Sequence, residues 1–212
     1  MAMALDLVGG ERQWFIASRW QEYEGESRAN LLRTAAVGLF YCVELLRFYV
    51  FEKGAAAQLA FHQHATMIAV AWTILALAIG MCLRLRIFPA ALKYVSTACD
   101  ILLLTSLAAL NAPGPFSPLV LGYFLIIAMA ALRFSLPLVW FTTLASMLGY
   151  WLLVGLVDQK WFDSDHAVPP ARQLVTLLSL GFTGVVIGQV IWRVKSLASD
   201  YAQRLAAAEK TA

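Results

Sequence analysis

Six apolar runs, each near the length that crosses a bilayer, follow one another along this chain with short polar segments between them. The hydrocarbon core of a bilayer is about 30 Å thick and needs roughly 20 apolar residues per helix. Because backbone polar groups in lipid must be paired within their own segment, each run predicts a helix. The result is an all-α integral membrane bundle of six helices, with spans at residues 31–51, 65–83, 94–110, 118–132, 136–157 and 174–192.

The basic residues are shared unevenly between the two sides of the membrane that six spans define. If the N-terminus is inside, twelve of the 16 Lys and Arg residues lie on the cytoplasmic side. Cytoplasmic loops carry an excess of these residues, so the distribution predicts that both termini are cytoplasmic. The twelve are Arg12, Arg19, Arg28, Arg33, Arg84, Arg86, Lys93, Arg133, Arg193, Lys195, Arg204 and Lys210. The other four are Arg47, Lys53, Lys160 and Arg172.

The segment before the first span, residues 1–30, interleaves charged residues with aromatic and aliphatic ones, namely Trp14, Phe15, Ile16 and Trp20. This pattern favours an interfacial helix lying on the inner membrane face, with aromatic rings at headgroup level. An ordinary soluble helix leading into the bundle is the alternative. The segment lacks a sustained apolar stretch of its own, so we expect no cleavable signal peptide.

The segment after the bundle (residues 31–193) is a predicted cytoplasmic helical tail, residues 194–212. No helix breaker separates it from the sixth span. Apolar side chains recur in it at spacings of three and four, a stripe typical of a helix that pairs with a second copy or another protein. We call Val194, Leu197, Tyr201 and Leu205 the tail stripe.

Charged residues inside a span are costly, so each one requires a reason. Glu44 and Arg47 lie three residues apart in the first span and share a helix face. They are interpreted either as a self-compensated pair or as a site for a polar ligand or a proton. Asp100 lies deep in the third span. We expect it to pair with a basic residue at the inner face, such as Arg84, Arg86 or Arg133, as a structural lock; a signalling role is the alternative.

Gly184 and Gly188 form a GxxxG pattern in the sixth span. Small residues at this spacing allow two helix backbones to approach closely. The contact predicted here lies either inside the bundle or across a homodimer. A dimer contact at this position would align two copies of the tail stripe.

Several classes of function are disfavoured by what the chain contains. Hydrophobic residues make up 61 % of the 212 and charged residues 14 %, which leaves no room for a soluble catalytic domain. GxSxG, HExxH and P-loop patterns are absent, so we expect no enzyme and no catalytic residue. No lysine lies in the middle of a span, so we expect no retinal bound as a Schiff base. A net charge of +3 spread along span ends does not indicate nucleic-acid binding.

Metal ligands are present without a metal-binding pattern. His62 and His64 lie two residues apart, and on a helix this spacing turns the two rings to opposite sides. The acidic loop between the fifth and sixth spans matches no defined motif and is interpreted as solvated; its candidate ligands are Asp158, Asp163, Asp165 and His166. We therefore expect no metal and no cofactor.

The third to fifth spans carry a recognisable series of segments, at residues 99–110, 113–119, 123–127 and 130–137. An acidic residue opens a Leu-rich span, a Gly-containing turn ends near Pro-Phe, and a tight hairpin joins the fourth and fifth spans. The series resembles the six-helix input domain of membrane-bound bacterial sensor histidine kinases and class III nucleotide cyclases, without their output domain. In redox-sensing kinases the turn reads GGxxNPF and is implicated in quinone sensing. Here only Gly114, Pro115 and Phe116 match part of it.

The resemblance implies a bacterial inner-membrane protein with a signalling role. The expected function is a non-catalytic sensory or scaffold module that passes a membrane or periplasmic cue through the sixth helix to a cytoplasmic partner. Membrane lipid, a second copy of the chain and a cytoplasmic signalling protein are its expected partners. One alternative is an accessory structural subunit of a larger membrane complex. A second is a small transporter or channel, in which Glu44 and Asp100 would line a polar path between two three-helix halves.

Overall fold

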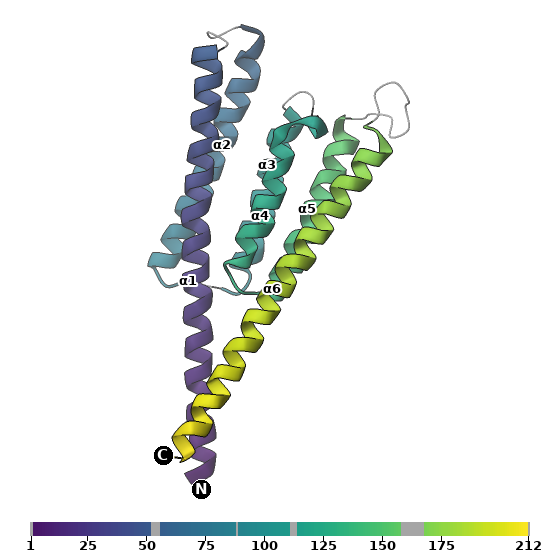
Figure 1. The fold of residues 1–212 in the computed structure, drawn as a ribbon. Coiled ribbons are helices and arrows are strands. Elements are labelled where there is room, and N and C mark those ends of the chain that lie inside the picture. The colour runs from purple at the N-terminus through teal and green to yellow at the C-terminus, as the bar shows by residue number, and fades with distance from the viewer. Residues whose placement is uncertain (1, 52–55, 88, 111–113, 158–167, 212) are drawn as a thin grey trace. The chain divides into compact units, whose positions relative to one another are not determined.

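The computed structural model describes residues 2–51, 56–87, 89–110, 114–157 and 168–211. Helices account for almost all of these residues, and no strand occurs among them. The main helices are α1 (Ala2–Leu46), α2 (Ala56–Arg84), α3 (Leu92–Leu110), α4 (Leu121–Ala131), α5 (Leu136–Val157) and α6 (Pro170–Thr211) (Figure 1). A π-helix, η1 (Arg47–Phe51), continues α1, and two 3-10 turns, η2 (Gly114–Phe116) and η3 (Pro118–Val120), precede α4.

Five helical segments in the described part of the chain are long and apolar enough to cross a membrane: Glu22–Phe51, Gln58–Arg84, Leu92–Leu110, Leu136–Leu156 and Pro170–Arg204. This finding confirms the predicted all-helical class, with helices of the length and composition that a membrane span requires. The fourth predicted span, residues 118–132, falls in a shorter apolar segment, Pro118–Ala131. Prolines and the 3-10 turns at its beginning shorten its regular helix to the 11 residues of α4.

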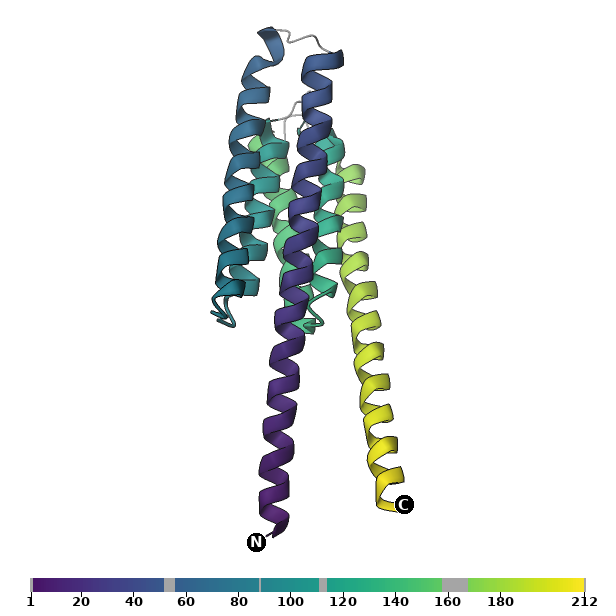
Figure 2. The same cartoon turned by 90° about the vertical axis from the view of Figure 1, so that its left-hand side faces the viewer.

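The N-terminal segment differs from the expected separate interfacial helix. Residues 2–30 and residues 31–46 of the first predicted span form one helix, α1, without a break at residue 30 (Figure 2). The physical reason is local, because the junction at residues 20–33 is rich in Glu, Arg and Leu, which are strong helix formers. The side chains of Trp14, Phe15 and Ile16 lie outside the described residues.

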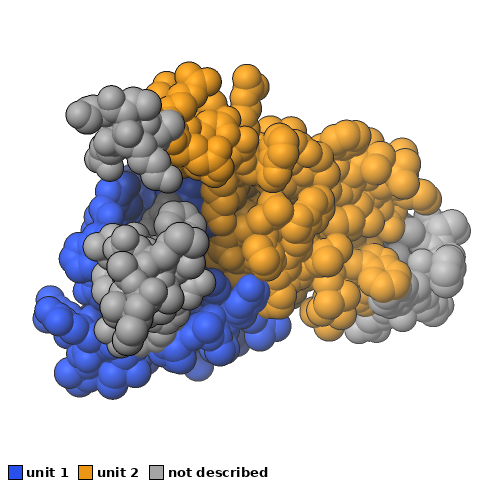
Figure 3. Space-filling view, turned by 90° about the horizontal axis from the view of Figure 1, so that it is seen from below, with its two compact units in different colours: residues 1–103, 132–134 blue, residues 104–131, 135–212 orange. Residues whose placement is uncertain are grey.

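The chain divides into two compact units (Figure 3). Unit 1 comprises Met1–Leu103 and Leu132–Phe134, and unit 2 comprises Leu104–Ala131 and Ser135–Ala212. In unit 1, α1 and α2 lie side by side (Figure 2). Two hydrogen bonds cross this pair, between the Tyr41 and Thr66 hydroxyls (3.2 Å) and from the Asn30 amide to the Ala76 carbonyl (3.0 Å). Most large apolar side chains of the pair are exposed, as expected of lipid-facing helices.

In unit 2, α4, α5 and α6 pack together around a fully buried apolar core, made up of Tyr123, Ile127, Leu138, Val139, Leu153 and Leu180. The predicted tight hairpin is present, since α4 ends at Ala131 and α5 begins at Leu136. Ahead of α4, Gly114 adopts a positive φ of 58°, a conformation that favours glycine. The Ser117 side chain then caps η3 by accepting a hydrogen bond from the Leu119 backbone N–H.

Candidate functional site

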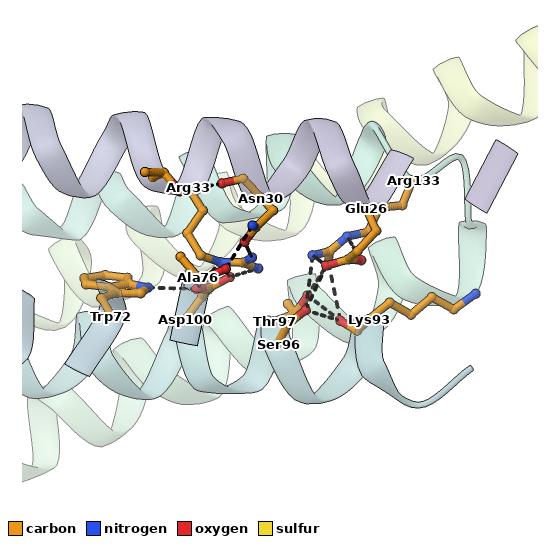
Figure 4. A network of polar contacts seen from close by, with 11 residues as sticks. Glu26, Asn30, Arg33, Trp72, Ala76, Lys93, Ser96, Thr97, Asp100 and Arg133 are labelled. Atoms are coloured by element: carbon orange, nitrogen blue, oxygen red, sulfur yellow. Dashed lines mark hydrogen bonds and ion pairs between the residues drawn. The ribbon is translucent and has the colours of Figure 1, made fainter. Parts of the chain in front are cut away.

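The most elaborate polar structure in the described residues is a buried network inside unit 1, which we call the polar ladder (Figure 4). One face of α1 and one face of α3 supply most of it. The spacings of four, four and three on α1, and of three, one and three on α3, each keep these residues on a single helix face. Its members are Glu22, Glu26, Asn30 and Arg33 on α1, Trp72 on α2, Lys93, Ser96, Thr97 and Asp100 on α3, and Arg133 after α4.

At one end of the ladder, Arg33 and Asp100 form a bidentate ion pair. The Arg33 Nε donates to Oδ1 of Asp100 at 2.8 Å, and its Nη2 donates to Oδ2 at 2.8 Å. The Trp72 indole N–H donates to the same carboxylate at 2.7 Å. Arg33 is only 2 % exposed and Asp100 3 %. Paired guanidinium–carboxylate bonds of this type fix both orientation and distance.

The sequence predicts that Asp100 pairs with a basic residue at the inner face, such as Arg84, Arg86 or Arg133. It does pair with a basic residue, but with Arg33 and with none of these three. Arg84 and Arg86 are exposed at the end of α2. Arg33 takes the position because α1 and α3 turn their polar faces toward each other, which places its side chain opposite Asp100 (Figure 4). Sequence reasoning had assigned Arg33 only to membrane orientation.

In the middle of the ladder, Arg133 pairs with Glu26. The Arg133 Nε lies 2.7 Å from Oε2 of Glu26, and its Nη2 donates to Oε1 at 2.8 Å. Its Nη1 donates to the Thr97 hydroxyl at 2.6 Å and to the Lys93 carbonyl at 3.3 Å. Burial lowers the pKa of the Arg133 guanidinium, while the Glu26 carboxylate raises it. An arginine remains charged under such conditions.

The other end of the ladder is closer to solvent. The Lys93 Nζ donates to Oε1 of Glu22 at 2.9 Å, and the Glu22 side chain is 32 % exposed. With this pair, the ladder contains three acidic and three basic side chains and is neutral. A neutral, internally bonded network of buried charges contributes little net stability. Removing one of its side chains is nevertheless strongly destabilising, because the partner is left as an unpaired buried charge. The ladder therefore fixes the register of α1 against α3.

A glycine allows α1 to approach the turn between α4 and α5. A Cβ added at Gly25 would lie 2.7 Å from the Leu132 carbonyl oxygen and 3.0 Å from the Arg133 Cα. Both are backbone atoms, so neither can rotate away. The close approach brings the turn within reach of Glu26, the next residue on α1. Sequence reasoning did not single out Gly25 or Glu26.

The predicted pair Glu44 and Arg47 lies at the other end of the α1–α2 pair. The Arg47 Nε is 3.1 Å from Oε2 of Glu44. His62 on α2 also faces this carboxylate, with its Nδ1 at 3.6 Å, and stacks on Phe48 with ring centroids 4.1 Å apart. The π-helix η1 begins at Arg47, and single π turns of this kind recur at functional sites.

Gly184 and Gly188 are used inside unit 2. A Cβ at Gly184 would collide with the Thr143 side chain on α5, and one at Gly188 would lie 3.3 Å from the Leu136 Cδ1. The glycine pattern therefore serves the contact of α6 with α5, which is the first of the two predicted uses.

In the tail stripe, Val194, Leu197 and Tyr201 are 44 %, 50 % and 68 % exposed. The Leu205 side chain lies outside the described residues, as do the candidate ligands Asp158, Asp163, Asp165 and His166.

Comparison with protein-family models, with curated proteins and with solved structures gives no match. The class of the protein therefore rests on its own helices. The described chain is all-helical, with five apolar helices long enough to cross a membrane and a buried, charge-balanced polar ladder.

Proposed function

We propose that the chain is a non-catalytic sensory or scaffold module of a bacterial inner membrane, which passes a membrane or periplasmic cue through α6 to a cytoplasmic partner. The observation that carries this proposal is α6 itself. It is one helix of 42 residues, from Pro170 to Thr211. A helix rises about 1.5 Å per residue, so the part beyond Trp192 extends roughly 30 Å past the last predicted span. An unbroken helix transmits displacement or rotation along its length.

The tail stripe supplies the contact surface for that partner. This part of α6, residues 193–204, is exposed on all sides. The side chains that it offers to a partner include those of Val194, Leu197 and Tyr201. Exposed apolar stripes at this spacing mark helix–helix interfaces. The partner class that fits is a cytoplasmic signalling protein with a helical docking face, or a second copy of the chain.

The proposed topology has six crossings, with both termini in the cytoplasm. It counts Pro118–Ala131 as a crossing, because α4 and α5 form a hairpin and α5 is of spanning length. The excess of Lys and Arg at the proposed inner side supports this orientation. Reporter domains fused to the N-terminus and to the C-terminus should both report the cytoplasm. Reporters on opposite sides of the membrane would mean an odd number of crossings and would exclude the proposed six-crossing topology.

The function is tested by captured partners in native membranes. The full-length protein is crosslinked in the source bacterium, purified in mild detergent and analysed for mass and co-purifying proteins. Leu197→Glu places a charge in the tail stripe, and we expect it to lose the captured partner. Ser199→Glu is the matched control, because it adds the same charge on another face of the same exposed helix. Equal capture by both variants would exclude the tail stripe as the contact surface.

A structural subunit of a larger complex is the second candidate. The observation that favours it is the low burial of the first spanning segment, Glu22–Phe51. Only 6 % of an apolar stretch of 18 residues in this segment is buried. Recovery at fixed stoichiometry within a large membrane assembly would favour this candidate over the sensory one. The transporter alternative has less support, since both carboxylate oxygens of Asp100 are engaged by Arg33 and Trp72.

A further inference from the structure

A groove runs between α1 and α2 in unit 1, with a volume of about 240 Å³. Its lining includes small residues, namely Gly38 on α1 and Ala69 and Ala76 on α2. A Cβ built at Gly38 meets no atom within 4 Å, so the space beside this residue is open. The lining extends over residues 66–76 of α2, which is roughly 15 Å of helix.

Every hydrogen-bond donor on the side chains that line the groove is already used within the protein. The hydroxyls of Thr34, Thr66 and Thr73 donate to backbone carbonyls one turn earlier in their own helices. The Tyr41 hydroxyl is bonded to that of Thr66, and the Trp72 indole N–H donates to Asp100. A polar ligand would have to give up hydrogen bonds to water without gaining donors here, which is costly. A hydrocarbon occupant makes no hydrogen bonds to water, so it loses none on entering the groove.

The position of the groove decides the source of that hydrocarbon. Its lining residues fall near the middle of the two spanning segments, Glu22–Phe51 and Gln58–Arg84. At this depth a bilayer offers lipid tails and excludes water and headgroups. The extent of roughly 15 Å is about half of the hydrocarbon thickness, so a groove near mid-membrane accommodates the terminal part of one lipid tail. The volume exceeds that of an apolar cavity of about 150 Å³ that holds one benzene ring.

We propose that this groove is a binding site for one acyl chain of a bilayer phospholipid. The inference rests on the proposed sensory function in one respect, because it names the cue as a lipid tail. Trp72 connects the two, since its indole lines the groove and donates to the Asp100 carboxylate of the polar ladder. A tail packed against the indole contacts the side chain that helps to hold the Arg33–Asp100 pair.

The test uses the full-length protein in vesicles of phosphatidylethanolamine and phosphatidylglycerol. A small fraction of phosphatidylcholine with a diazirine near the end of one acyl chain is added as the probe. After illumination, adducts are mapped by peptide mass spectrometry. We expect them to concentrate on the groove residues of α1 and α2. Gly38→Leu fills the open space, and we expect it to lower the groove adducts about tenfold, the factor that displacement of two methylenes gives.

The matched control is Gly181→Leu, at a second helical glycine whose Cβ also meets nothing within 4 Å. It should leave the groove adducts unchanged. If Gly38→Leu does not fold, as judged by its thermal unfolding in detergent, Ala69→Leu fills the groove from α2 instead. Adducts spread evenly over outward residues such as Leu77 and Met81, and insensitive to the filling variants, would reduce the groove to ordinary bilayer contact and overturn the proposal.

Two further results would also overturn it. Displacement of the phospholipid label by a photoreactive free fatty acid would assign the groove to a free ligand. Crosslinks between two differently tagged copies at Gly38 would assign it to a protein helix. The labelling needs no cytoplasmic partner, so its outcome is separate from that of the proposed function. Leu197→Glu should label as the unmodified chain does, even where it loses the captured partner.

Discussion

Replacing Asp100 by asparagine is expected to lower the free energy of unfolding by about 3 to 5 kcal/mol, the cost of leaving one buried charge without its partner. Asparagine keeps the shape of the side chain, so the loss reports the charge. The Arg33 guanidinium, 2 % exposed, would remain buried with no carboxylate beside it. Unfolding in mild detergent by added sodium dodecyl sulfate, followed by circular dichroism, measures the change.

The matched control removes both charges. Arg33→Met combined with Asp100→Leu leaves no uncompensated ion, and apolar replacements of a buried pair are often close to neutral. We expect the double variant to regain most of the stability that Asp100→Asn loses, short of the bond from Trp72. If Arg33→Met and Asp100→Leu instead had independent, additive costs, the two side chains would not act as a pair.

Gly25→Ala is expected to destabilise the protein by about 1 to 3 kcal/mol, because the added methyl group meets backbone atoms that cannot repack. The contact lies beside Glu26, so the turn that carries Arg133 must shift and the ion pair must lengthen. The same unfolding assay measures the loss. Gly38→Ala is the control on the same helix and should raise stability by up to about 1 kcal/mol, since its Cβ meets nothing and alanine favours the helix. Equal effects at both positions would contradict the close approach at Gly25.

The helices could be predicted because a bilayer imposes length and composition on each span. The hairpin between α4 and α5 followed from the short connection after Ala131. The 3-10 turns that shorten α4 were not predicted, since the apolar run continues through residues 118–120 and only the prolines indicate a break. The unbroken junction within α1 was missed because the charged residues before the first span were read as an interface pattern.

The ladder was only partly visible in the sequence. Asp100 stood out because a carboxylate in an apolar run needs a partner, but Arg33 lies at the edge of its own run and was counted with the residues that orient the chain. A signal was present in the matched faces of Glu22, Glu26, Asn30 and Arg33 on α1 and of Lys93, Ser96, Thr97 and Asp100 on α3. Gly25 had no such signal, because the turn that it meets is more than a hundred residues away in sequence.

That separation has a consequence for how the protein is made. Glu26 and Arg133 are 107 residues apart, and Arg33 and Asp100 are 67 apart. At a synthesis rate of roughly 5 to 20 residues per second, the Glu26 carboxylate exists for about 5 to 20 s before its partner leaves the ribosome. An unpaired carboxylate is costly in hydrocarbon, so this end of α1 stays in water during that interval. We therefore expect insertion of this end of the first helix to finish only after Arg133, in the turn that follows the fourth helix, has been made.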